Sequence, residues 1–162
     1  MKHIEVEIKI PLKTKVEILL SQLEDLGFLL TKQIRECDTY FNSAFYDFRK
    51  KDEALRIREC EDLKTGKKYS ELTYKGPKLD QVSMTRKELE CKFESPDTLR
   101  EILETIGIKG LYEVDKKRSY YKKDKMNACV DQVKNLGEFL ELEIILLIFS
   151  LSISISFIWT FF

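Results

Sequence analysis

The chain has 162 residues, and its 28 lysines and arginines are balanced by 28 aspartates and glutamates. This length suits one domain with a core of its own. The lack of net charge argues against a protein built to bind nucleic acid or anionic lipid. Hydrophobic residues make up 43% of the chain, which excludes general disorder.

A five-residue pattern, Glu-x-Glu-x-Lys, opens the chain at Glu5-Val6-Glu7-Ile8-Lys9. In an extended strand alternate side chains share a face, so the pattern predicts two acids and a base on one face and apolar residues on the other. A capping box, Thr14-x-x-Glu17, then predicts a helix start. The helix carries an apolar stripe closed by Gly27, made of Val16, Leu19, Leu20, Leu23 and Leu26.

The middle of the chain alternates in the manner of strands. We expect strands over 35–42, 54–61 and 68–75, with a hairpin turn at Thr65-Gly66 between the last two.

A second copy of the pattern, Glu88-Leu89-Glu90-Cys91-Lys92, lies in a predicted strand over 82–93. Ser95-Pro96 then predicts a helix start, and Gly107 closes an apolar stripe made of Leu99, Ile102, Leu103 and Ile106. An aromatic pair follows each closing glycine at the same spacing, Tyr40-Phe41 after 27 and Tyr120-Tyr121 after 107. The chain therefore reads as a duplicated unit of strand, helix and further strands. We interpret these aromatic side chains as packing residues of the core, and stacking on a nucleobase is the alternative.

Strands over 114–121, 126–133 and 139–144 complete the prediction, with a turn at 135–137. The result is an α+β fold of about eight strands and two helices, in which the sheet is largely antiparallel.

The cysteines and the single histidine limit the metal chemistry. Cys37, Cys60, Cys91 and Cys129 lie far apart, without a Cys-x-x-Cys pair, and His3 is the only histidine, so a zinc site is not expected. The first strand begins almost at Met1, which leaves no signal peptide. We expect a cytoplasmic domain whose reduced thiols lie mostly in the core.

Charged residues recur strand after strand, often at i and i+2. The bases are Lys9, Arg56, Arg58, Lys75, Arg86, Lys116 and Arg118, and the acids are Glu5, Glu7, Glu88, Glu90, Asp131, Glu141 and Glu143. One explanation is a sheet with a solvated outer face. The other is a closed eight-stranded barrel with charge in its lumen, where a polyanion and a divalent metal would compensate the ions. The residues alone leave both open.

Several motifs in register carry a resemblance to a known family. They are Glu5-x-Glu-x-Lys9, Leu55-Arg-Ile-Arg58, Tyr74-Lys-Gly-Pro77, Arg86-Lys-Glu-Leu-Glu90, Val114-Asp-Lys-Lys-Arg118 and Val130-Asp131 through Leu136-Gly-Glu-Phe-Leu-Glu-Leu-Glu143. Together they resemble the CYTH, or triphosphate tunnel metalloenzyme, superfamily. Cys37-Asp-Thr-Tyr-Phe41 and Lys75-Gly-Pro77 are most similar to its class IV adenylate cyclase (CyaB-type) branch.

The resemblance implies a closed tunnel of eight antiparallel strands in two pseudo-repeats, with helices outside and a triphosphate bound through Mg²⁺ or Mn²⁺. By position, the seven bases given above would grip the phosphates. Glu5, Glu7, Glu141 and Glu143 would ligate metal, with Asp131 and Glu90 as further candidates. Oxygen ligands of this kind suit Mg²⁺ or Mn²⁺.

The reaction that the resemblance implies is cyclisation of ATP to cyclic AMP and pyrophosphate. The alternatives are hydrolysis of thiamine triphosphate or tripolyphosphate, and a polyphosphate- or nucleotide-binding module without turnover. A homodimer is compatible with this reading, and nucleic acid is not an expected partner.

The chain changes character at its end. Residues 144–162 carry no charge, and 145–162 form a tail separate from the expected 1–144 domain. A membrane anchor is one explanation, since about twenty uncharged residues can span a bilayer. The other, which we favour, is a truncated or frameshifted reading frame, because the change is abrupt.

Overall fold

The computed structural model describes residues 3–13, 15–78 and 86–147, and the side chains of 8–13, 15–78 and 86–143. Eight strands form one sheet in which every pair of neighbours is antiparallel, in the order β1-β8-β7-β6-β2-β3-β4-β5. Two helices complete the α+β fold that the sequence predicts. The elements are β1 (His3–Pro11), α1 (Val16–Asp25), β2 (Leu29–Ser43), a short 3-10 helix (Arg49–Lys51), β3 (Ala54–Asp62), β4 (Lys68–Lys78), β5 (Arg86–Phe93), α2 (Pro96–Thr105), β6 (Ile108–Lys123), β7 (Met126–Val133) and β8 (Gly137–Leu147).

The strand order has an internal two-fold symmetry. Exchanging each of β1 to β4 with its counterpart among β5 to β8 gives the same strand order read from the opposite edge of the sheet. The counterparts β2 and β6 pair with each other at the centre. Each helix links the first and second strands of its half. The duplicated unit predicted from the sequence is therefore present in the topology.

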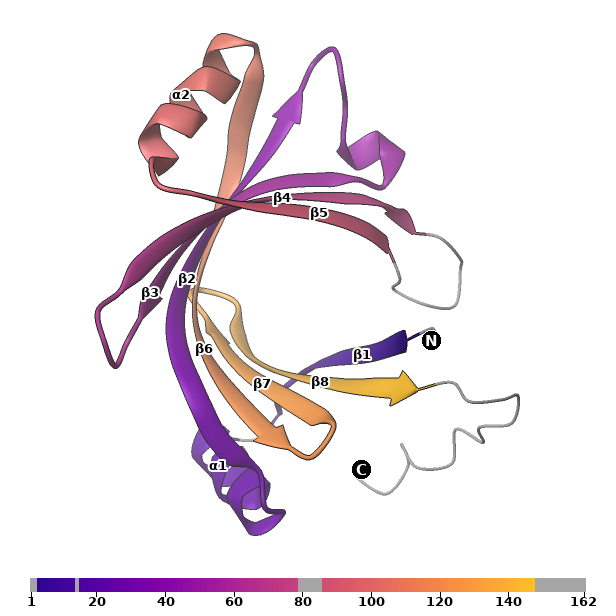
Figure 1. Cartoon of the computed structure of the whole chain (residues 1–162), viewed down its shortest axis with the longest axis vertical. Helices are drawn as coiled ribbons and strands as arrows, with labels where there is room; N and C mark the ends of the chain where they lie inside the picture. Colours follow the sequence, from indigo (N-terminus) through magenta and orange to yellow (C-terminus); the bar gives the residue numbers. More distant parts are fainter. Residues whose placement is uncertain (1–2, 14, 79–85, 148–162) are drawn as a thin grey trace.

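Both helices lie on the convex side of the curved sheet (Figure 1). Val16 and Leu23 of α1 pack with Tyr121, Ala128 and other apolar residues of β6, β7 and β8. Leu103 of α2 packs with Phe41 and Ile57. These are the alternate positions that the sequence pattern assigns to an apolar face, so the core takes up one side of the sheet and leaves the other to the charged residues.

The predicted closure of the sheet is not confirmed. In the part of the chain that the structure describes, β1 and β5 are the two ends of the hydrogen-bonded order and no ladder joins them. The sheet curves, as Figure 1 shows, but hydrogen bonds do not close it into a barrel.

The predicted elements are all present with shifted ends. The residue before α1 is Lys15, without a side-chain cap, and the Thr14 of the predicted capping box lies outside the described residues. Residues 82–85 of the fifth predicted strand also lie outside the described residues. Strand β8 continues through Leu147, so three residues of the expected tail pair with β1, while 148–162 lie outside the description. Across the described ranges, no helix is long and apolar enough to cross a membrane.

All four cysteines lie in strands and are free. Cys60 and Cys129 are buried and Cys37 is half-buried, but Cys91 is exposed. The expectation that the thiols lie mostly in the core is confirmed for Cys60 and Cys129 and does not extend to Cys91, which lies on the edge strand β5.

Candidate functional site

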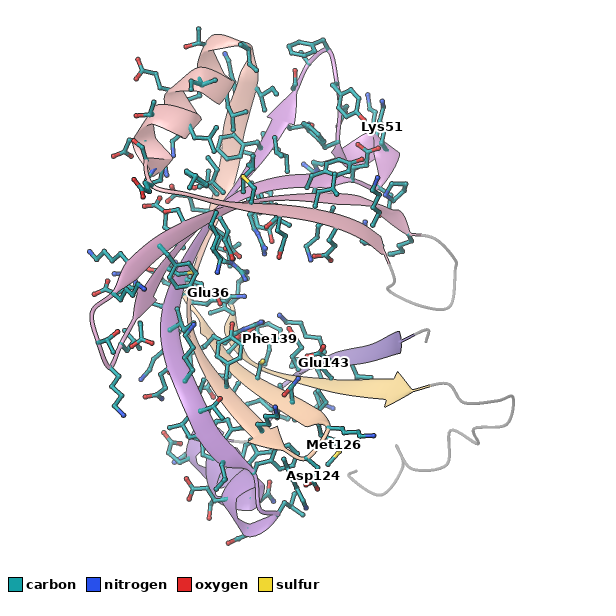
Figure 2. The ribbon with its side chains drawn as sticks, in the orientation of Figure 1. Glu36, Lys51, Asp124, Met126, Phe139 and Glu143 are labelled. Atoms are coloured by element: carbon teal, nitrogen blue, oxygen red, sulfur yellow. The ribbon has the colours of Figure 1, made fainter. Side chains whose placement is uncertain are left out.

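The concave face of the sheet carries the ionic side chains. Residues directly opposite in an antiparallel ladder share a face, and the ladders align Glu36 with Lys116, Arg118 with Asp131, and Lys9 with Glu141. Figure 2 shows Glu36, from the centre of the sheet, and Phe139 and Glu143, from β8, on the concave side. The predicted site residues on several strands are therefore brought onto one surface.

Arg118 is the centre of a first cluster. Its guanidinium donates two hydrogen bonds to the fully buried Asp131, at 2.6 and 2.7 Å, and two to Glu141, at 2.9 and 3.4 Å. Lys9 reaches the same two carboxylates, at 3.1 and 3.2 Å. Two bases and two acids from four strands thus compensate one another, as buried ions require.

A second cluster forms in the other half of the sheet. Arg58 donates hydrogen bonds of 2.6 and 2.7 Å to the two oxygens of Asp38. Arg56 lies 3.5 Å from the same carboxylate and donates to the Thr73 hydroxyl at 3.1 Å. Arg56 is buried, and its Nε has no hydrogen-bond partner among the described atoms. This guanidinium therefore retains a free donor.

Glu36 connects the two clusters. Its Oε2 lies 3.1 Å from both Arg58 and Lys116, without an aligned hydrogen bond to either, and its Oε1 accepts a bond of 2.9 Å from Tyr120. Lys116 lies in turn 3.8 Å from Asp131. The network is continuous from β3 to β1 through the centre of the sheet.

The network shifts the proton affinities of its members. Burial acts to raise the pKa of Asp131, but the hydrogen bonds and charge of Arg118 outweigh it and lower the pKa to about 2. The same competition, won by Arg58 and its neighbours, lowers the pKa of Glu36 and of Asp38. Burial and the charge of Arg118 lower the pKa of Lys116. Asp131, Glu36 and Asp38 are therefore ionised at neutral pH.

Lys75 of β4 and Arg86 of β5 bind carboxylates outside the two clusters. Lys75 pairs with Glu88 at 2.8 Å, and both are partly exposed. Arg86 donates to Asp52 and to the Gly76 carbonyl, so it sits beside the 3-10 helix and away from the buried clusters.

The predicted metal ligands divide into two groups. Asp131 and Glu141 each form ion pairs with Arg118 and Lys9. Glu143 is half-buried, accepts a bond of 3.2 Å from Asn127, and is aligned with Glu7 in the β1–β8 ladder. The side chains of Glu5 and Glu7 lie outside the description. Among the side chains within it, no group of three or more His, Cys, Asp or Glu could hold a metal, and Glu90, on the rim, lies 3.5 Å from Thr73.

Sequence reasoning missed two buried acids. Glu36 and Asp38 are 1% and 2% exposed, and they bind the bases of β3 and β6. Their spacing at i and i+2 in Arg35-Glu36-Cys37-Asp38 is the signal that marked the other acids, and it could have found them.

The two aromatic pairs are split between the faces. Phe41 and Tyr121 are buried in the two apolar clusters, as the packing interpretation predicts. Tyr120 instead donates to Glu36, and Tyr40 stacks on Tyr112, with ring centroids 5.0 Å apart. Tyr112 was not foreseen as part of an aromatic pair.

A match to a known family agrees with this fold and site. The model of the CYTH domain family matches residues 3–146, and the chain belongs to that family. It is 45% identical over 140 residues to the Methanocaldococcus jannaschii protein named "Putative adenylate cyclase MJ0240", covering 86% of this chain and 76% of that one.

Solved structures share the fold. The PH1819 protein from Pyrococcus horikoshii OT3 superposes with a TM-score of 0.77 at 34% identity, over 90% of this chain and 80% of that one. A Hippeastrum protein, HpAC1, titled a "putative adenylyl cyclase" with "a dominant triphosphatase activity", superposes with a TM-score of 0.62 at 18% identity, over 90% and 80% of the two chains. At that identity the likeness concerns the fold alone.

Proposed function

We propose that the protein is a divalent-metal-dependent enzyme that binds a triphosphate on the concave face of its sheet and converts ATP to cyclic AMP and pyrophosphate. One observation carries the proposal: bases from β1, β3 and β6 converge in a continuous ionic network that is buried except at Lys9, and the Nε of Arg56 has no partner among the described atoms. A buried donor without a partner is costly, and a ligand oxygen would satisfy it. The name of the Methanocaldococcus jannaschii relative supports the choice of the cyclase reaction.

The bases of the network would hold the phosphates. Arg56, Arg58 and Arg118 present planar guanidinium groups suited to paired contacts with phosphate oxygens, and Lys9 and Lys116 add compact charges. Each is already oriented by a carboxylate. The site is therefore arranged for an anion before the substrate arrives, which lowers the reorganisation that binding requires.

Lys75 and Arg86 would act from the rim. Lys75 is paired with a half-exposed carboxylate, so a phosphate could replace that partner at little cost. We assign them to the outer part of the substrate, and the buried bases to the reacting phosphates.

The acids suit a hard divalent cation. Glu143 fits best among the described acids, since the hydrogen bond that it accepts from a described side chain comes from a neutral amide. We propose that Glu5, Glu7 and Glu143 hold Mg²⁺ or Mn²⁺, and we keep Glu141 and Glu90 as candidate ligands that would have to exchange their present partners for the metal. Asp131 is assigned to orienting Arg118 and Lys9. The metal would supply charge neutralisation on the phosphate oxygens.

In this reaction the ribose 3′-oxygen bonds to the α-phosphorus, the bond from that phosphorus to the bridging oxygen breaks, and pyrophosphate leaves. The hydroxyl proton passes to solvent. Catalysis would come mostly from position and charge, as in phosphoryl transfer generally.

Product analysis tests the proposal. The full-length protein is incubated with ATP and Mg²⁺ or Mn²⁺, and cyclic AMP, pyrophosphate and orthophosphate are separated and quantified. Equal amounts of cyclic AMP and pyrophosphate support the cyclase. The same incubation is made with tripolyphosphate and with thiamine triphosphate. Release of orthophosphate from either of them, without cyclic AMP from ATP, would show that the protein is a hydrolase and not a cyclase. Tight binding with no product at all would leave only a binding module.

A further inference from the structure

Tyr40 and Tyr112 form an aromatic pair on the concave face. Their rings are 5.0 Å apart at the centroids and 21° from parallel, and they lie opposite each other in the β2–β6 ladder. Tyr40 is also the ladder partner of Arg56 on the other side of β2. The pair therefore lies next to the guanidinium that has a free buried donor.

The backbone at this point departs from regular pairing. The ladder shifts register between Tyr40 and Phe41, where Tyr40 is opposite Tyr112 but Phe41 is opposite Gly110. A bulge of this kind changes the direction of a side chain and is common beside active sites. Tyr112 remains 51% exposed, so part of its aromatic surface is not covered by the protein.

The equivalent residue in the other half is engaged differently. Tyr120 occupies the place of Tyr40 in the second repeat, and its hydroxyl is bonded to Glu36. Among the described hydrogen bonds, neither Tyr40 nor Tyr112 donates from its hydroxyl to a protein group. The stacked pair, half-buried at Tyr40 and half-exposed at Tyr112, has no hydrogen-bond partner among the described side chains, and it belongs to neither apolar cluster.

We propose that the Tyr40–Tyr112 pair is the platform on which the purine base of the nucleotide stacks. This proposal rests on the proposed function, because it names where the base of a nucleoside triphosphate lies when its phosphates are held by the network. Aromatic rings stack on nucleobases without requiring a particular hydrogen-bond pattern.

The spacing along β2 agrees with such a ligand. Tyr40 follows Asp38 on the same face, and residues at i and i+2 of a strand are about 6.5–7 Å apart. Asp38 binds Arg58 and Arg56, which we assign to the phosphates. The aromatic pair therefore lies one step along the face from the Asp38–Arg58 pair, which is the separation that a ribose would span between a phosphate held at Arg58 and a base on Tyr112.

Equilibrium binding tests the platform separately from turnover. The affinities of α,β-methylene-ATP and of tripolyphosphate are measured by calorimetry with Mg²⁺, for the full-length protein and for Tyr112→Leu and Tyr112→Phe. We expect Tyr112→Leu to weaken the nucleotide about tenfold or more, the effect of losing one base–aromatic stack. Tripolyphosphate, which has no base, should bind both variants as it binds the wild type.

Tyr112→Phe is the matched control, because it keeps the ring and removes the hydroxyl; it should bind the nucleotide within about twofold of the wild type. The proposal is overturned if Tyr112→Leu weakens both ligands equally, or neither. The proposed cyclase fails on a different result, the absence of cyclic AMP from the wild type. If the wild type binds the nucleotide through Tyr112 but forms no product, the stacking proposal therefore stands and the proposed cyclase reaction is wrong.

Discussion

Glu36 and Lys116 occupy equivalent positions in the two repeats, and they pair with each other across the centre of the sheet at 3.1 Å. The next residues on the same face, Asp38 and Arg118, are equivalent as well and also differ in charge. Each binds a partner of opposite charge on the following strand, Asp38 with Arg58 and Arg118 with Asp131. The two halves thus share a backbone plan while their charges are exchanged, which allows the network to be neutralised internally at the centre.

The Glu36–Lys116 pair should show strong energetic coupling. We expect Glu36→Gln and Lys116→Met each to lower the free energy of unfolding by about 2–4 kcal/mol, because each leaves a buried ion short of a partner. The double variant should lose about 1–3 kcal/mol less than the sum of the singles. Urea unfolding of the four proteins measures this.

The matched control is an exposed pair between neighbouring strands. Glu61 and Lys68 lie 3.9 Å apart with side chains 39% and 75% exposed, so their coupling should stay below about 1 kcal/mol. Equal coupling in the two pairs would contradict the buried network.

Asp131 should make stability depend on pH in the acid range. Its pKa of about 2 in the folded protein lies below the ordinary value, so its contribution is complete above about pH 4 and is lost as the pH falls toward 2. Asp131→Asn should lower the unfolding free energy at pH 7 by about 3–5 kcal/mol, and the gap to wild type should narrow through that range. Unfolding curves from pH 7 to 2 measure it.

Asp97→Asn provides the comparison, since Asp97 pairs with Arg100 at 2.7 Å but is 94% exposed. This substitution should lower the free energy of unfolding by less than about 1 kcal/mol at every pH. A gap for Asp131→Asn that stays constant down to pH 2 would show that the carboxylate is not held ionised by Arg118.

Glu143→Gln should abolish metal-dependent turnover with little change in stability, because the amide keeps the size of the side chain but loses the charge a divalent cation needs. Glu5→Gln should behave alike. The control is Glu101→Gln on α2, at an exposed position on the convex side. Turnover is measured against Mg²⁺ concentration alongside thermal unfolding. Wild-type rates in both Glu143→Gln and Glu5→Gln would remove them from the metal site.

The cysteines should react with a thiol reagent in an order set by burial. Cys91 is exposed and should be labelled first, and Cys37, which is half-buried, more slowly. Burial raises the pKa of Cys129 to about 12, so this thiol and the buried Cys60 should react only on unfolding. Mass spectrometry of timed digests gives the rates, and labelling of Cys129 as fast as Cys91 would mean that β7 opens readily.

Much of the fold follows from local patterns in the sequence. The two Glu-x-Glu-x-Lys strands, the apolar stripes before Gly27 and Gly107, and the alternation of Arg56 and Arg58 with Leu55 and Ile57 identify the elements and their faces. Both glycines have positive φ, of 83° and 86°, as helix ends closed by glycine require.

The pairing of the charges does not follow from local patterns. Which acid meets which base depends on ladder register and strand tilt, and these bring Lys9 to Asp131 across 122 positions of the chain. The sequence also does not distinguish an ion that faces a ligand from one that orients its neighbour, so Asp131 was predicted as a metal ligand and lies bonded to Arg118. The direction of the Tyr112 side chain depends on the bulge between β2 and β6, and no feature of the sequence predicts that bulge.

The binding of tripolyphosphate by the concave face is the most direct test. Calorimetry with Mg²⁺ compares the full-length protein with Lys9→Met and Lys75→Met, whose partly exposed lysines can be removed without leaving a fully buried cavity, and with Lys117→Met at an exposed position on the other face of β6. We predict that the wild type binds, that Lys9→Met and Lys75→Met each weaken binding about tenfold or more, and that Lys117→Met has no effect. Equal affinity in all four proteins would contradict a phosphate site on this face.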